Sequence, residues 1–321
     1  MSLIPTLADE LSLEIIRLAA TPVYEVCDED PNPHYCYSTA LSLARVSSNF
    51  YVEVMPILLD TVSLRTRQSL LAFQRLIHKI NSRQSPLAHR GVDFPRLIQK
   101  SRIYSKEIYG NTADTPSGDY LDYKPVYDVL KNARAMGIHV DSTYHLLYNA
   151  LDERGVPADD WTCRDALFWG GWTKWKELTC SIGGLAFLRQ LKRLTIWIDD
   201  KSHKPSDDPR GLPAWTRTIP FHHMPNLTHF ACTLTGSSEA HTPPTRMMVY
   251  IAPPSALGQD RHVIEQWILN PLDRHGVVVE FSPRQYSTST SLEEAYFCGD
   301  GDRAWEEASR RLALLGDYQG P

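Results

Sequence analysis

The segment from Leu7 to Ala20 limits the fold of this chain more than any other part of it. Its first apolar stripe has the spacing i, i+4, i+8, i+11 of an amphipathic helix: Leu7, Leu11, Ile15 and Leu18. A second apolar patch, Leu13 and Ile16, falls on roughly the opposite side at about 100° per residue. A small N-terminal subdomain alone cannot bury both sides of one helix. Either the helix is fully buried in a core, or one stripe packs against the chain's own core and the other contacts a partner protein.

Two more helices are expected before residue 64. Pro22 ends the first helix, and residues 23–37 form a loop with a turn-forming cluster at 28–33. Ser38 or Thr39 caps a second helix that runs to about Met55. Pro56 suits the first turn of a short third helix, and residues 62–64 form an extended exit.

Three blocks in this region resemble the parts of an F-box, in the family's order. Residues 7–16, LADELSLEII, resemble its opening, Leu-Pro-x-Glu-Leu followed by an apolar helix. Residues 43–50, LARVSSNF, are similar to its second helix, Leu-x-x-Val-Cys-Lys/Arg-x-Phe/Trp. Residues 56–64, PILLDTVSL, resemble its closing Pro-x-Leu-Tyr-x-x-Val-x-Leu. The resemblance is closest to the F-box-like proteins of mushroom-forming fungi, and it covers residues 7–64.

The resemblance implies a three-helix head over residues 1–66 that binds a Skp-type adaptor and, through it, a cullin scaffold. The residues that it implies in adaptor contact are Leu7, Ala8, Glu10, Leu11, Ile15, Leu18, Leu43, Val46, Phe50, Leu58 and Leu59. Two of these depart from the family pattern, because Ala8 replaces the usual proline and Leu59 stands where an aromatic residue is common. Periodicity does not decide which stripe of the first helix faces the adaptor.

Residues 67–321 are expected to form a body of mixed helices and strands. Helices are predicted at 68–81, 123–136, 142–151, 259–269 and 303–315, and a short helix or turn is predicted at 184–191. Strands are predicted within 96–108 and at 178–180, 194–198, 227–232, 247–251, 277–281 and 295–297. A helix between the strands at 247–251 and 277–281 favours a parallel crossover.

One stretch of the body has the leucine spacing of a repeat protein. Leu188, Leu191, Leu194 and Ile196 form this unit, and Met224, Leu227 and Phe230 form a weaker echo. The 33 residues from Leu194 to Leu227 exceed the usual leucine-rich repeat of about 20–29 residues. An ordinary α/β domain is an equal alternative. The expected fold class is therefore α+β (mixed α/β): an F-box-like head followed by a degenerate leucine-rich-repeat-like or irregular α/β body.

Composition narrows the classes of partner. The 321 residues carry a net charge of −5, which gives no basic excess for nucleic acid or an anionic membrane. No apolar run approaches the roughly 18 residues that span a bilayer, and no targeting signal opens the chain. The six cysteines form no CxxC pair and are interpreted as reduced thiols. A cytoplasmic or nuclear protein is expected, without nucleic-acid or membrane partners.

The sequence contains no phosphate-binding loop, nucleophile elbow or zinc-protease motif. His222, His223 and His229 lack further ligands at metal spacing, and the sequence GDGD at 299–302 reads as a turn with a helix cap. No metal, cofactor or catalytic residue is therefore expected. The least usual composition is a tryptophan-rich segment, read either as core packing or, more weakly, as a target-binding surface: Trp161, Trp169, Trp172 and Trp175.

These expectations lead to a non-catalytic function. The first hypothesis is a substrate-recognition subunit of an SCF-type ubiquitin ligase, with the head on the adaptor and the body holding an unknown target protein. The alternative is a protein-interaction module that keeps the head but no longer serves ubiquitin ligation, a reading favoured by Ala8 and Leu59. An enzyme housed in residues 85–321 is a third hypothesis, and no motif supports it.

Overall fold

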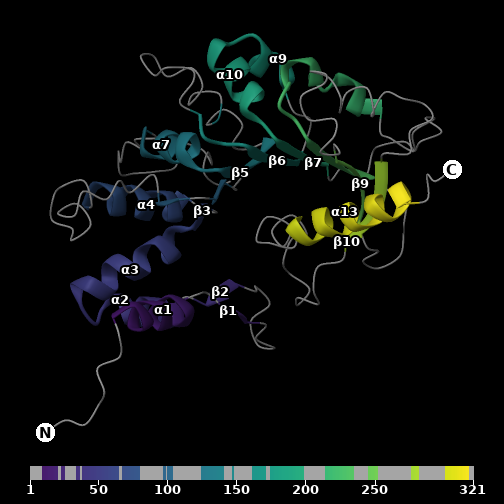
Figure 1. Cartoon of the computed structure of the whole chain (residues 1–321). Coiled ribbons are helices and arrows are strands. Elements are labelled where there is room, and N and C mark those ends of the chain that lie inside the picture. The colour runs from purple at the N-terminus through teal and green to yellow at the C-terminus, as the bar shows by residue number, and fades with distance from the viewer. Residues whose placement is uncertain are drawn as a thin grey trace, which may run out of the picture.

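Figure 1 shows the structure of the protein, a computed structural model. The structure describes residues 9–20, 23–25, 34–36, 38–64, 67–79, 97–98, 100–103, 124–140, 147, 161–170, 174–198, 214–234, 245–251, 276–281 and 301–317. These residues form a mixed fold of helices and strands, in agreement with the expected α+β class.

Eight of the described strands form one sheet, and they follow one another in chain order. Strands β3 to β8 are all parallel, whereas β9 and β10 are antiparallel to their neighbours. An unbroken sequential order of parallel strands means that each connection returns the chain to the same edge, one strand further along. The strand bounds are Thr61–Leu64 (β3), Lys100–Ile103 (β4), Ala135–His139 (β5), Asp165–Gly170 (β6), Arg193–Ile198 (β7), His229–Leu234 (β8), Thr245–Ile251 (β9) and Gly276–Phe281 (β10).

One face of the sheet carries the larger core. The register pairs Leu194 with Phe230, and Ile196 with Cys232, and all four side chains are buried. Leu188 and Leu191 are buried just before the first strand of this pair, as Met224 and Leu227 are before the second. The equivalent positions are therefore 36 residues apart rather than 33. The segments on this face are Arg67–Lys79 (α4), Lys124–Asn132 (α7), Trp175–Thr179 (α9), Ile182–Gln190 (α10), Ala214–Thr218 (η5) and Phe221–His223 (η6).

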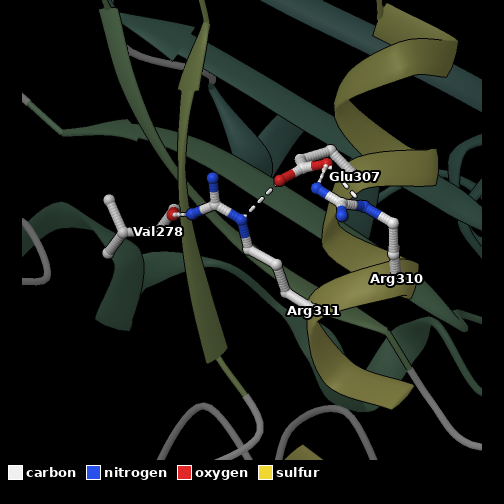
Figure 2. A network of polar contacts seen from close by, with 4 residues as sticks. All are labelled: Val278, Glu307, Arg310 and Arg311. Atoms are coloured by element: carbon white, nitrogen blue, oxygen red, sulfur yellow. Dashed lines mark hydrogen bonds and ion pairs between the residues drawn. The ribbon is translucent and has the colours of Figure 1, made fainter. Parts of the chain in front are cut away.

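Helix α13, Gly301–Asp317, covers the other face over β8, β9 and β10 (Figure 1). Trp305 is buried there and meets the ring of His229 edge-on at a centroid distance of 5.4 Å. Figure 2 shows how the exposed side of the helix is tied to the sheet. Glu307 accepts hydrogen bonds from Arg310 (2.6 Å) and Arg311 (2.6 Å), and Arg311 also donates to the carbonyl of Val278 (3.0 Å). Strand β10 and α13 are thereby joined by a polar contact as well as by the core.

Several predicted elements of the body differ from the structure. Residues 178–180, expected as a strand, belong to the end of helix α9 and the turn after it. The strands β9 and β10 are antiparallel, so the expected parallel crossover is wrong. Strand β5 takes residues that were assigned to the end of a helix at 123–136, and strand β6 was not predicted. The helix at 259–269 and the strand at 295–297 lie outside the described residues, as does the helix at 142–151 apart from Leu147.

The head consists of helices α1 (Asp9–Ala20), α2 (Ser38–Ala44) and α3 (Ser48–Leu59), with short strands β1 (Val23–Glu25) and β2 (His34–Cys36). The strands form an antiparallel pair where a loop was expected. The predicted second helix is broken, because the Ser47 side chain accepts the N–H of Phe50 at 3.2 Å and starts a new helix. Pro56 lies inside α3, so the separate short helix expected to begin at this proline is not formed.

The head and the sheet are continuous at residues 55–64. Met55 and Leu59 of α3 are buried in the larger core, and β3 forms the edge strand of the sheet next to β4. The boundary expected at residue 66 therefore follows a strand that belongs to the sheet. None of the helices in the described ranges is long and apolar enough to cross a membrane.

Candidate functional site

Helix α1 packs into the head through its second apolar patch. Ile16 is 6% exposed and Ala20 is 1% exposed, and they form a small separate core together with Ala40 of α2 and Val54 of α3. Leu13, on the same patch in the sequence, is half-buried. The stripe that the sequence could not orient therefore points away from the head's own core.

Five large apolar side chains of the head lie in solvent, and we call them the apolar head surface. They are Leu11 (58% exposed), Ile15 (56%), Leu18 (67%), Leu41 (48%) and Val46 (65%). In the part of the chain that the structure describes, they make up five of the seven exposed large apolar residues. The first three share one face of α1, Leu41 lies on the neighbouring helix α2, and Val46 lies in the turn after it. Such a concentration of exposed apolar side chains is typical of an interaction site.

Polar contacts hold α1 in this orientation. The guanidinium of Arg17 lies 3.2 Å from the carboxylate of Glu53 on α3, and 3.9 Å from that of Glu14 one turn earlier. The pair between α1 and α3 is exposed, so it contributes about 1 kcal/mol at most and acts mainly on orientation. The small core around Ile16 carries most of the stability of the head.

The structure separates the other residues expected at the adaptor. Leu43, Phe50 and Leu58 are half-buried against the head core, so each shows only part of its side chain. Leu59 is 6% exposed in the larger core, which replaces its expected contact role with a structural one. Glu10 lies in α1, and Leu7 and Ala8 lie outside the described residues. The exposed Leu41 was missed, because it falls off the stripe that runs through Leu43.

The tryptophan-rich segment is core rather than surface wherever it is described. Trp161 packs edge-on against Phe187 at 5.2 Å, and Trp175 packs edge-on against Phe168 at 5.8 Å. Trp169 is 2% exposed, on the opposite face of the sheet. These three side chains are too buried to contact a target, and Trp172 lies outside the described residues.

The histidines with described ring contacts lie in the body, away from the head. The rings of His222 and His223 lie with their centroids 4.0 Å apart at an interplanar angle of 47°, whereas His229 contacts Thr228 and Trp305. Among the described side chains, no group of three or more His, Cys, Asp or Glu is placed to hold a metal ion. Burial raises the pKa of the Cys163 and Cys232 thiols far above the usual value, which keeps them protonated.

In comparisons with known proteins, no family model matches the chain, and neither a curated protein nor a solved structure matches it significantly. An apolar surface like the apolar head surface binds by removing its side chains from water.

Proposed function

We propose that the chain is a substrate-recognition subunit of an SCF-type ubiquitin ligase. In this proposal the apolar head surface docks onto a Skp-type adaptor, which connects the chain to a cullin scaffold. The body holds a target protein, and no bond is made or broken by the chain itself. Its contribution is proximity, because holding the target raises the effective concentration of its lysines near the ubiquitin carrier.

The exposure of Leu11, Ile15 and Leu18 is the observation that carries this proposal. Leu11 and Ile15 lie within the F-box-like block at 7–16 and Leu18 lies two residues after it, and the core that holds α1 is complete without them. Complete burial of a Leu or Ile side chain contributes about 1.5–3 kcal/mol. Since the side chains of the apolar head surface are about half to two-thirds exposed, their burial would contribute roughly 4–9 kcal/mol before the cost of association.

The arrangement of the rest of the chain agrees with this division of labour. Helix α3 lies in both cores, through Val54 in the head and Met55 and Leu59 in the body. A partner on the head is therefore connected rigidly to the sheet. The sequential parallel strands resemble those of a repeat protein, although their spacing is irregular. A repeat-like body supplies an extended surface of the kind that holds other proteins.

Co-expression with a Skp adaptor followed by size-exclusion chromatography tests the proposal. The full chain should co-elute with the adaptor at one-to-one stoichiometry. Leu11→Asp and Ile15→Asp should each abolish co-elution, because each places a carboxylate in an apolar contact. Ile182→Asp is the matched control, because Ile182 is 81% exposed on helix α10 of the body and its loss should leave co-elution unchanged.

Two outcomes would contradict the proposal. Folded Leu11→Asp and Ile15→Asp variants that still bind the adaptor would show that the apolar head surface is not the contact. A monodisperse chain that ignores the adaptor would favour the alternative, an interaction module outside ubiquitin ligation. Circular dichroism of each variant separates loss of binding from loss of folding.

A further inference from the structure

Three basic residues occupy equivalent positions at the edge where parallel strands enter the sheet. Arg134 directly precedes β5, Arg164 precedes β6 and Lys192 precedes β7. The carbonyl of Arg134 accepts the N–H of Arg164 at 2.8 Å, and that of Arg164 accepts the N–H of Lys192 at 2.7 Å. The carbonyl of Lys192 in turn accepts the N–H of Thr228 at 2.9 Å, before β8. We call Arg134, Arg164 and Lys192 the basic edge.

All three side chains of the basic edge are exposed, and none has an ion-pair partner among the described residues. Their neighbour Arg193 differs, because it lies 3.4 Å from Asp302 of α13. Adjacent strands are about 4.8 Å apart, so the backbone positions of these three like-charged residues lie within about 10 Å of one another along the sheet. These charges repel one another, and an anion bound across them relieves the repulsion.

The positive charge continues beyond the basic edge. Arg189, in the last turn of α10, is exposed, and its carbonyl accepts the Asn226 side-chain amide at 2.6 Å. Its charge reaches His223, whose pKa is lowered by partial burial first and then by His222 and Arg189. The segments 131–134, 161–165 and 189–193 together hold six basic residues and one acidic residue: Lys131, Arg134, Arg164, Arg189, Lys192, Arg193 and Asp165.

We propose that the basic edge binds an extended acidic segment of the target protein, through the carboxylates of Asp or Glu residues at alternate positions, which share one face of an extended chain. The identity of the ligand as a target rests on the proposed function. An extended chain advances about 3.3 Å per residue, so three or four residues match the span of the basic edge. The planar guanidinium groups of Arg134 and Arg164 suit bidentate carboxylate contacts. A long polyanion such as duplex nucleic acid is disfavoured by the net charge of −5, whereas a short segment meets the local charge alone.

The test uses the purified full chain and a fluorescein-labelled deca-glutamate peptide, with deca-glutamine as the uncharged control, in anisotropy titrations. The glutamate peptide should bind at least tenfold more tightly than the glutamine peptide, and several-fold more weakly at 250 mM than at 50 mM salt. The double variant Arg134→Glu/Arg164→Glu should weaken binding at least tenfold. Arg75→Glu/Lys176→Glu makes the same change in net charge at exposed positions on α4 and α9, and it should change binding less than twofold.

Equal losses in the two double variants would overturn the proposal, because they would show an effect of net charge alone. The proposal would also be overturned if the two peptides bound equally or if the glutamate peptide did not bind. Binding of a 20-base-pair DNA duplex as tightly as the glutamate peptide would overturn it too. The adaptor experiment is independent of this one. Failure to bind the adaptor with peptide binding intact would remove the proposed function and leave the basic edge, whereas the reverse result would remove the basic edge alone.

Discussion

Substitution by alanine should destabilise the protein strongly at one position of helix α1 and hardly at all at the adjacent position. Ile16 is 6% exposed in the head core, and Ile15 is 56% exposed on the apolar head surface. Ile16→Ala removes buried methyl groups and leaves a cavity, which costs about 2–5 kcal/mol. Ile15→Ala removes groups that are already largely in water, and alanine has the higher helix propensity, so its effect should stay within about 0.5 kcal/mol.

The gap between the two variants is large enough to measure locally. A difference of about 2 kcal/mol is roughly a thirtyfold change in the equilibrium between folded and open α1. Amide hydrogen exchange of the full chain, read by mass spectrometry over residues 9–20, reports this local opening. Protection of α1 should fall at least thirtyfold in Ile16→Ala and should be unchanged in Ile15→Ala.

The converse result would refute the orientation of α1. If Ile15→Ala lowered the protection of α1 as much as Ile16→Ala, both stripes would be buried and the apolar head surface would not exist in solution. Urea unfolding monitored by circular dichroism provides a second readout, with the same order of stability expected. This test measures stability alone, so it examines the orientation of α1 independently of adaptor binding.

Two further predictions concern α13 and its contact with β8. Trp305→Ala should lower the free energy of unfolding by about 3–5 kcal/mol in urea titrations, because it leaves a cavity in the core. Arg310→Ala, on the exposed side of the same helix, should change the free energy of unfolding by less than about 0.5 kcal/mol. Similar effects of both variants would contradict the packing of α13. Burial, and then the charge of Arg193, lowers the pKa of His229 to about 4, so the folded state favours the neutral ring and should lose stability as the pH falls from about 6.5 to 4. The melting temperature of His229→Gln should be less sensitive to pH over this range, and an unchanged dependence would rule out His229 as its source.

The helices of the head could be located from sequence, but not their ends or their orientation. The stripe through Leu43, Val46 and Phe50 is helical throughout, so periodicity does not reveal the break at Ser47, which a side-chain cap produces. The orientation of α1 depends on contacts with Ala40 and Val54, which are distant in sequence. The apolar periodicity of one helix does not indicate which distant residues it will pack against.

In the body, strands with apolar periodicity were found, whereas their partners and directions were not. Strands β5 and β6 are short apolar runs of the kind that periodicity cannot assign to helix or strand. The antiparallel direction of β10 is set by pairing with β9 and has no sequence pattern of its own. The basic edge was also missed, because Arg134, Arg164 and Lys192 are separated by unequal intervals of 30 and 28 residues and align only in the register of the sheet.

The sequential order of the sheet has a consequence for the length of the molecule. The head is attached at β3, and β9, β10 and α13 end the parallel series at the other side. Insertion or loss of one strand with its connection between these ends would change their separation by about 4.8 Å and leave both intact. The described strands set this separation at about 34 Å. The number of parallel strands therefore sets the distance along the sheet between the head and the end formed by β9, β10 and α13.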